Sequence, residues 1–383
     1  MAKYVSRTTI MSNPVHYHYD KFPPRQLDWE KLIPLIGPAS AELARFDGAL
    51  SSLPNAALLM SPLTTQEAVL SSRIEGTQAT MGEVLEFEAE ENTADFSSEK
   101  KADIYEVINY RMALMHAVDM LESLPLCQRV VRESHKILMQ GVRGKNKTPG
   151  QYRRISNWIG PHGSTIDTAR FVPISADKLN DAMSSWEKYI HEEAADKLIQ
   201  LAIVHAEFES IHPFLDGNGR IGRMCVPLFM YKKGFINSPM FYISAYFEAN
   251  RDEYYDRLFA VSRDNDWTGW CNFFLKAVYE QAKSNHEKTL AILSMYNLKK
   301  IEITDITHSQ YAIYALDFIF SKPMFKASDF YRHDSIPNST ARHTLRQLRD
   351  SNLLKLHRKS SGRRSAVYVF PDLLNLIEGY SAF

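Results

Sequence analysis

A twelve-residue segment, His212-Pro-Phe-Leu-Asp-Gly-Asn-Gly-Arg-Ile-Gly-Arg223, constrains the fold of this chain more than any other feature. It lies between a run with helical spacing that ends near Ile211 and the apolar run Met224–Tyr231, so it predicts a helix, a loop and a second helix. Gly217 and Gly219 remove side chains that would keep a ligand away from the backbone. Successive backbone N–H groups ahead of a helix N-terminus form a cavity for an anion, and phosphate fits such a cavity.

Four side chains add chemistry to that loop. Asp216 is a hard oxygen ligand of the kind that Mg²⁺ takes when it also binds phosphate. Arg220 and Arg223 lie three residues apart on one helical face, so their guanidinium groups can neutralise different phosphates of a triphosphate. His212, with an ordinary pKa of about 6.5, can take a proton from an attacking hydroxyl at neutral pH. An ordinary turn with Asp216 as a helix cap explains any one of these residues, but their joint occurrence favours a site that transfers part of a nucleotide.

The rest of the chain has mostly helical spacing. Helices are predicted over Thr64–Leu85, interrupted at Gly76, and over Asp103–Leu121. Two short extended runs, Gln151–Ile159 and Ala169–Pro173, flank a turn at 160–163 and predict a hairpin. The first segment is rich in prolines, each of which should end a helical run, so we expect short helices between Pro14, Pro23, Pro24, Pro34, Pro38 and Pro54.

Charge and cysteine content exclude several classes of function. Lys plus Arg and Asp plus Glu both total 45, so the formal net charge is zero and attraction to nucleic acid must come from a local patch. Cys127, Cys225 and Cys271 lack the paired spacing of a disulfide framework or a zinc site. The N-terminus has no signal-peptide stretch, and no apolar run of about 18 residues predicts a membrane span. We therefore expect a soluble cytoplasmic protein that does not bind membranes.

The segment from His212 to Arg223 resembles the signature of the Fic family, His-Pro-Phe-x-Asp/Glu-Gly-Asn-Gly-Arg-x-x-Arg, and meets every fixed position of it. The resemblance covers residues 15–280 and implies a mainly α fold, with a Fic-type helical core and a small β-hairpin flap. It implies that His212 deprotonates a Ser, Thr or Tyr hydroxyl of a target protein, that Asp216 holds Mg²⁺, and that the hydroxyl attacks the α-phosphate of ATP. The nucleotide would be bound by Gly217, Asn218, Gly219, Arg220 and Arg223. Because the loop keeps both glycines, whereas related phosphorylating proteins carry a lysine near the second one, AMP transfer is favoured.

A second resemblance lies in Ser71-Ser-Arg-Ile-Glu75-Gly76, which is similar to the inhibitory-helix motif Ser/Thr-x-x-x-Glu-Gly/Asn of self-inhibited Fic proteins. It implies that Glu75 pairs with Arg223, the group that orients the γ-phosphate, so that ATP binds in an unproductive pose. Ser71 and Gly76 belong to the same inhibitory motif. On the residues alone, Glu75 also fits a surface acid at a helix end, with Gly76 as the stop.

Two further segments match positions that the family uses. The predicted hairpin Gly150–Pro173 lies where Fic proteins place a flap that captures the target backbone by strand addition. Asn250, within Tyr246–Tyr255, lies where the family contacts adenine and ribose, although an interhelical loop of packed tyrosines explains the same residues.

The C-terminal segment resembles a winged helix in the order of its expected elements. Helices over Tyr311–Phe320 and near 325–331 precede a helix over Asn338–Arg349 and two extended runs, Leu353–His357 and Ala366–Phe370. Arg342, His343 and Arg346 would face outward, and the turn near Gly362 would form a basic wing, so residues 338–364 are a candidate DNA-binding surface. Docking of a protein or dimerisation fits such a unit equally well.

We expect three units, because 383 residues exceed the roughly 250 to 300 that one core supports. They are an N-terminal helical region with the inhibitory helix (1–120), the Fic catalytic core (121–285) and the winged-helix-like domain (286–383). The expected function is a protein adenylyltransferase, inhibited by Glu75, that uses ATP and Mg²⁺ on another protein or on itself. The alternatives are an ATP-sensing DNA-binding transcriptional regulator and an enzyme that removes AMP from modified protein. A homodimer is also compatible with the sequence.

Overall fold

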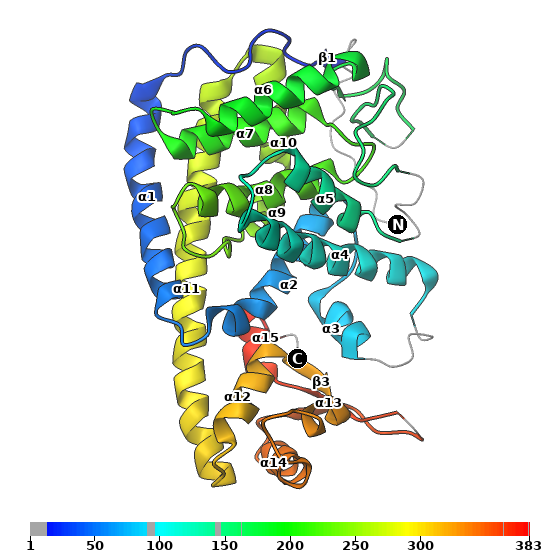
Figure 1. Ribbon diagram of the computed structural model, residues 1–383, viewed down its shortest axis with the longest axis vertical. Helices are drawn as coiled ribbons and strands as arrows, with labels where there is room; N and C mark the ends of the chain where they lie inside the picture. Colours follow the sequence, from blue (N-terminus) through cyan, green and yellow to red (C-terminus); the bar gives the residue numbers. More distant parts are fainter. Residues whose placement is uncertain (1–13, 90–95, 142–146, 162, 363, 382) are drawn as a thin grey trace.

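One long helix organises the molecule (Figure 1). α11 (Trp267–Thr307) runs for 41 residues along its length, and α1 (Trp29–Ser51) packs against its upper half. The carboxylate of Asp266 caps α11 by accepting a hydrogen bond from Gly269 N, and a left-handed residue, His308, ends it. The computed structural model describes residues 14–89, 96–141, 147–161, 163–362, 364–381 and 383.

The prolines of the N-terminal segment do not divide it into short helices. Pro34 and Pro38 lie inside α1, and Pro62 lies inside α2 (Ala56–Ile74), so that expectation was wrong. Pro34 and Pro38 are exposed and four residues apart, on the side of α1 away from its buried residues. Burial of the opposite face against α11 outweighs the hydrogen bonds that the two prolines remove.

The functional core is a set of helices packed around α7 (Lys197–Ile211) and α8 (Asn218–Lys232). Almost every described residue of these two helices is buried, which explains why neither shows the one-sided apolar pattern of a surface helix. Packed on these two helices are α2, α4 (Ser98–Leu121), α5 (Gln128–Leu138), α6 (Leu179–His191), α10 (Arg251–Asp264) and α11. Packed on those in turn are α3 (Met81–Ala89), η2 (Ala176–Lys178) and α9 (Ser244–Ala249). None of the helices in the described part of the chain is long and apolar enough to cross a bilayer.

The predicted hairpin is reduced to a single bridge. Only Ile159 pairs with Phe171 in antiparallel fashion, and most of residues 151–158 form irregular loop. The strand β2 (Phe171–Val172) instead pairs in parallel with β1 (Val15–His16) from the N-terminal segment. Arg153 explains the difference, because its side chain donates hydrogen bonds to four backbone carbonyls and holds the first run away from a strand. His162, in the expected turn, lies outside the described residues.

The C-terminal segment forms a small unit at the lower end of α11 (Figure 1). It contains α12 (Ala312–Ser321), β3 (Met324–Lys326), α13 (Ala327–Tyr331), α14 (Asn338–Asp350), β4 (Lys355–Arg358), β5 (Val367–Val369) and α15 (Pro371–Glu378). The three strands form an antiparallel sheet in the order β3-β5-β4. The three helices and two strands expected from the sequence are present in that order, β3 and α15 were not expected, and the assignment as a winged helix stays a prediction.

The expected boundary at residue 285 falls inside α11, so the chain has no break there. Asn285, Thr289 and Ile292 remain buried across it, and no glycine or proline follows Gly269 within the helix. The C-terminal unit also contacts α2, where Gln66 Nε2 donates to the carbonyl of Ile377 at 2.8 Å. Lys288 Nζ of α11 donates to the same carbonyl and to Gln66 Oε1, both at 3.0 Å.

Candidate active site

Two residues with positive φ shape the loop between α7 and α8. His212 ends α7 at φ 51°, and Gly217 begins α8 at φ 77°. Asn218 closes the loop on itself, because its side chain accepts from Phe214 N at 2.8 Å and donates to the Phe214 carbonyl at 2.9 Å. Both amide atoms of Asn218 are therefore engaged within the loop, which leaves its backbone N–H as the group that can face a ligand.

Two residues outside the loop hold it in place. His135 of α5 donates from Nε2 to the Asp216 carbonyl at 3.0 Å, accepts from Gly150 N at 2.9 Å, and stacks on Phe214. These bonds fix one neutral tautomer, and burial lowers the pKa of His135 to about 4. Arg153 is buried, and its guanidinium donates a hydrogen bond to the His212 carbonyl at 2.9 Å. Its backbone N–H donates to the Pro213 carbonyl at 2.9 Å. The loop is thus supported from α5 and from the irregular segment that follows it.

The His212 imidazole is neutral at physiological pH. Burial lowers its pKa to about 4, although the Glu209 carbonyl and nearby carboxylates favour the charged form. Nδ1 lies 3.3 Å from the Glu209 carbonyl oxygen. A carbonyl can only accept, so this contact requires a hydrogen on Nδ1 and leaves the lone pair on Nε2. His212 can therefore accept a proton through Nε2 without first losing one.

Asp216 and Arg220 lie together at the start of α8. Asp216 Oδ1 accepts from Gly217 N at 2.6 Å and from Arg220 Nη2 at 3.3 Å, and the Asp216 side chain is 43% exposed. Arg220 is buried and also pairs with Glu106 of α4 at 3.0 Å. The Arg220 charge is thus balanced by two acids on the protein.

Glu75 lies directly against the N-terminal turn of α8. Its Oε1 accepts from Arg223 Nη2 at 2.6 Å, and a Cβ built on Gly219 would lie only 2.1 Å from the same oxygen. Burial alone would raise the pKa of the Glu75 carboxyl, but the charge and hydrogen bond of Arg223 hold that pKa below its ordinary value. A carboxylate therefore occupies the space that the missing side chain of Gly219 leaves open.

Ser71 and Gly76 set the position of Glu75. Ser71 accepts two hydrogen bonds from Arg223, at 3.0 Å through Oγ and 2.8 Å through its carbonyl. Glu75 is the C-terminal cap of α2, and Gly76, at φ 101°, turns the chain away from the helix. Arg223 itself is 1% exposed. The last turn of α2 is thus hydrogen-bonded to the buried guanidinium of Arg223 in α8.

A pocket of about 550 Å³ opens beside this ion pair. Its polar wall includes His212, Gly219 and Arg223 with Glu75, and its apolar wall comes from the loop near 158–171 and from α10. The volume is in the range of small-molecule sites. Asn250 does not line the pocket, because it lies between α9 and α10 and donates to the Tyr246 carbonyl at 2.9 Å. Its neighbours Arg251 and Tyr255 do line it.

Known proteins share both the sequence and the fold that surround this pocket. Residues 33–119 match the family described as Fic/DOC family N-terminal, and residues 125–230 match the Fic/DOC family itself. The chain belongs to the Fic/DOC family. The two matches contain the Glu75 motif and the loop that begins at His212, respectively.

Two relatives of this Fic protein carry the name Protein adenylyltransferase fic-1. The one from Caenorhabditis briggsae is 30% identical over 118 residues, which is 28% of this chain and 22% of the relative. The one from Caenorhabditis elegans is 32% identical over 73 residues, or 18% of this chain and 14% of the relative. The chain thus aligns with less than a quarter of the length of either relative.

A solved structure shares the fold of this Fic protein over most of its length. The crystal structure of a Fic family protein from Desulfovibrio desulfuricans G20 superposes with a TM-score of 0.54 at 19% identity. The superposition covers 88% of this chain and 96% of that one. At this level of identity the likeness shows the fold alone.

Glu209 is a pocket residue that the sequence did not bring to attention. It lies on α7 one turn before His212, lines the pocket, and its Oε1 is buried without a hydrogen-bond partner among the described residues. Burial raises its pKa to about 8, with Glu75 adding to the effect and Arg223 opposing it. Its place three residues before His212, which puts the two side chains on neighbouring positions of one helical face, is the signal that could have identified it. His135, Arg153 and Glu106 carried no such signal, because their spacing to the loop does not reveal contact.

Proposed function

We propose that this Fic protein transfers AMP from ATP to a Ser, Thr or Tyr hydroxyl of a protein, and that Glu75 inhibits the transfer. The observation that carries the proposal is the position of the Glu75 carboxylate. An anionic group already lies at the N-terminus of α8, against Gly219 and bonded to Arg223. A helix N-terminus with a buried arginine favours a phosphate for the same reasons that it favours this carboxylate.

The transfer requires a base, and His212 has the properties of one. The target hydroxyl oxygen forms a bond to the α-phosphorus as its proton passes to His212 Nε2. The bond between the α-phosphorus and the bridging oxygen of the β-phosphate breaks, and pyrophosphate leaves with the electron pair. Because Nδ1–H is held by the Glu209 carbonyl, Nε2 is the acceptor throughout.

Asp216 has the chemistry expected of a Mg²⁺ ligand. Oδ1 is used by Gly217 N and Arg220, no described residue bonds to Oδ2, and the side chain is partly exposed beside the loop. One carboxylate with phosphate oxygens and water suits Mg²⁺. When bound, Mg²⁺ neutralises charge on the nucleotide phosphates. Asp216 would hold the ion, and the Arg220 side chain would then be freed to face a phosphate.

Glu75 would inhibit by competing with the nucleotide for Arg223. The guanidinium of Arg223 cannot hold the Glu75 carboxylate and a γ-phosphate in the same geometry, and the carboxylate would repel the phosphate at close range. Productive binding therefore requires the end of α2 to move away from α8, or Glu75 to turn outward. The inhibitory role makes wild-type activity low by default.

Mass spectrometry of three proteins tests the proposal. Wild type, Glu75→Gly and Glu75→Gly with His212→Ala are incubated with ATP and Mg²⁺, alone and with a cell lysate, and AMP-sized mass additions are mapped to peptides. We expect additions that rise with Glu75→Gly and disappear with His212→Ala, while ATP binding persists. Absence of AMP on any protein in all three reactions would refute the transfer and favour a site that only senses ATP.

The pH dependence of Glu75→Gly tests the role of His212 separately. Since burial lowers the pKa of His212 to about 4, the base stays unprotonated and the transfer rate should change less than twofold between pH 6 and pH 8. The measurement is the initial rate of AMP incorporation across that range. A roughly fourfold loss on acidification from pH 8 to pH 6 would show that His212 has the ordinary pKa of about 6.5 in the nucleotide complex.

Several finer predictions stay predictions. DNA binding by residues 338–364 is supported by the exposed His343 and Arg346, but Arg342 lies over the Tyr331 ring at 4.4 Å and donates to Asn338. A homodimer, a cytoplasmic location and removal of AMP remain untested expectations. Contact of adenine with Asn250 stays a prediction, and the Asn250 side chain donates to the Tyr246 carbonyl at 2.9 Å.

A further inference from the structure

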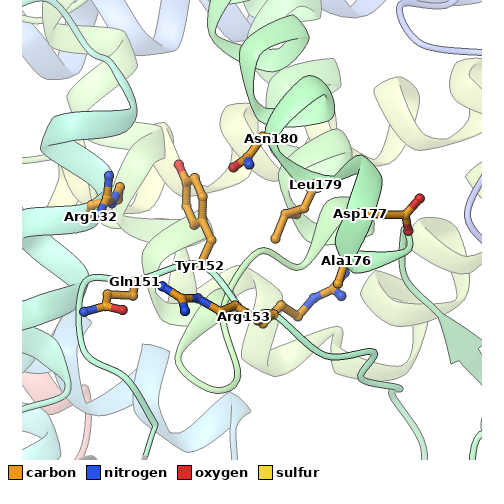
Figure 2. Close-up of a pocket in the computed structure, with 9 residues that line it drawn as sticks. Arg132, Gln151, Tyr152, Arg153, Ala176, Asp177, Leu179 and Asn180 are labelled. Carbon is orange, nitrogen blue, oxygen red and sulfur yellow. The ribbon is translucent and has the colours of Figure 1, made fainter.

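A second cleft lies along residues 151–154 and shares no lining residue with the pocket beside Glu75. It has a volume of about 680 Å³ and is formed by α5, residues 151–154, and the start of η2 and α6. Figure 2 shows Arg132 on one side of Tyr152, with Leu179 and Asn180 on the other and Asp177 at the far edge. Its remaining lining residues are Gln151, Arg153, Arg154 and Ala176. The cleft is therefore polar and contains three arginines against one carboxylate.

Two of the arginines can receive a ligand. Arg154 is exposed and forms no hydrogen bond or ion pair with any described residue. Arg132 uses Nε for the Gly150 carbonyl at 2.9 Å and rests on the Tyr152 ring, which leaves Nη1 and Nη2 free of partners in the described chain. These contacts hold Arg132 in one orientation, so little side-chain freedom is lost when it pairs with an acid.

The third arginine joins the cleft to the catalytic loop. Arg153 lines the cleft, yet its guanidinium donates to the His212 carbonyl at 2.9 Å and to the Ile211 carbonyl at 3.2 Å. A single side chain thus separates the cleft from the backbone of the proposed base. An extended chain advances about 3.3 Å per residue, so a few residues reach past one arginine side chain. A segment held in the cleft can therefore present a nearby hydroxyl to His212.

We propose that this cleft docks an acidic segment of the target protein, with Arg132 and Arg154 pairing with its carboxylates a few residues from the modified hydroxyl. The inference rests on the proposed AMP transfer and names a feature of its substrate. Selection comes from the local charge, because the chain as a whole carries no net charge that would attract acidic proteins.

An acidic peptide fits this cleft better than a nucleic acid does. Nucleic-acid binding relies on several phosphate contacts spread along a basic surface. Here only two arginines have free guanidinium nitrogens, and the Asp177 carboxylate at the edge would repel a continuous phosphate backbone. The side chains of Gln151 and Asn180 supply neutral donors and acceptors suited to a peptide backbone.

Fluorescence anisotropy with a labelled synthetic peptide tests the docking without ATP. The probe contains one serine flanked by glutamates, and the comparison probes are the same peptide with glutamines and a single-stranded oligonucleotide of similar length. The full-length protein is used as wild type, as Arg154→Glu, and as Arg132→Glu with Arg154→Glu. The control is Lys283→Glu with Lys300→Glu, which makes the same charge change at two exposed positions of α11.

We expect the acidic peptide to bind and the double variant to weaken it by roughly five- to twentyfold, since each exposed ion pair contributes up to about a factor of five. Arg154→Glu, which breaks no described contact, should account for part of that loss without lowering the melting temperature. Asp177→Asn should tighten binding, because it removes the one acid of the cleft. The control variant should bind as wild type does.

Several results would overturn the docking site. They are equal binding of the glutamine peptide, an unchanged affinity in the double variant, an equal loss in the control, or tighter binding of the oligonucleotide at the same arginines. In the Glu75→Gly background, the acidic peptide should also gain AMP faster than the glutamine peptide. If the acidic peptide binds through Arg132 and Arg154 but never gains AMP, the docking site stands and the proposed transfer fails.

Discussion

Replacement of Glu75 by glutamine separates the effect of the Glu75 charge on inhibition from the effect of the side-chain shape. Glu75→Gln keeps the side-chain length and a carbonyl oxygen that can still accept from Arg223 Nη2, now 2.6 Å away. What it removes is the negative charge. The variant therefore separates electrostatic inhibition from steric blockage of the space beside Gly219.

The size of the effect follows from this one contact. Arg223 stays charged, so Glu75→Gln keeps a hydrogen bond to a charged group and loses only the attraction between two full charges, which contributes about 1 kcal/mol for a partly exposed pair. Since 1.4 kcal/mol is tenfold, we expect AMP transfer to rise by about fivefold in Glu75→Gln. Glu75→Gly removes the whole contact and should raise it by roughly ten- to 150-fold.

The assay is the initial rate of AMP incorporation at fixed ATP and Mg²⁺, with ATP binding followed in parallel by thermal shift. The control is Glu83→Gln, which breaks an ion pair with Lys100 of 2.8 Å in the segment after α2 but does not contact Arg223. A glutamine variant no faster than wild type would refute the electrostatic account. So would equal activation by the Glu83 change.

Three further changes test the surroundings of the site. Gly219→Ala places a Cβ 2.1 Å from the Glu75 oxygen, so the strain should cost about 1–3 kcal/mol and should weaken nucleotide binding, measured by calorimetry. His135→Ala leaves the Asp216 carbonyl and a buried N–H unpaired, which should cost about 2–4 kcal/mol of stability and slow AMP transfer, measured by denaturant unfolding and initial rates. Glu209 keeps its proton up to a pKa of about 8, whereas the ordinary value is 4.5. Its contribution to wild-type stability is therefore complete below pH 4.5 and declines by up to about 1.4 kcal/mol per pH unit until pH 8 is passed, so Glu209→Gln should flatten the melting temperature between pH 6 and pH 9.

Each of these expectations has an opposing result. Unchanged nucleotide affinity in Gly219→Ala would mean that no ligand approaches that backbone. Wild-type stability of His135→Ala would mean that water replaces both of its hydrogen bonds. Equal pH dependence of melting in Glu209→Gln and wild type would mean that the Glu209 carboxyl ionises at its ordinary pKa.

The residues of the loop could be predicted from the sequence because they are neighbours along the chain. The spacing from His212 to Arg223 predicted one loop, of which His212, Gly219 and Arg223 line the pocket while Asp216, Gly217 and Arg220 do not. The resemblance to Fic proteins added Glu75, which is distant in the sequence and also lines the pocket. The supporting residues were missed. His135 and Arg153 donate hydrogen bonds to backbone carbonyls of the loop. Every residue has a backbone carbonyl, so the sequence does not indicate which side chain bonds to which carbonyl.

Local patterns also failed where tertiary packing outweighed them. Prolines at 34 and 38 signal helix breaks, yet α1 continues through both because its opposite face is buried along α11. The expected hairpin had the right turn residues, but residues 151–158 form a loop whose Arg153 side chain donates to the carbonyls of Ile155 and Ile174. In both cases contacts with distant residues decided the outcome, and local propensity is a weak guide there.

The hydrogen bonds of Gln66 make α2 a part shared by two units of the molecule. The same helix ends at Glu75 on the nucleotide side and bonds to α15 of the C-terminal unit two and a half turns earlier. Any displacement of α2 that frees Arg223 must therefore strain or reset its contact with Ile377. A ligand that binds the C-terminal unit more tightly in one position of α2 would therefore change the affinity of the protein for ATP. By thermodynamic linkage, ATP would change the affinity for that ligand by the same factor.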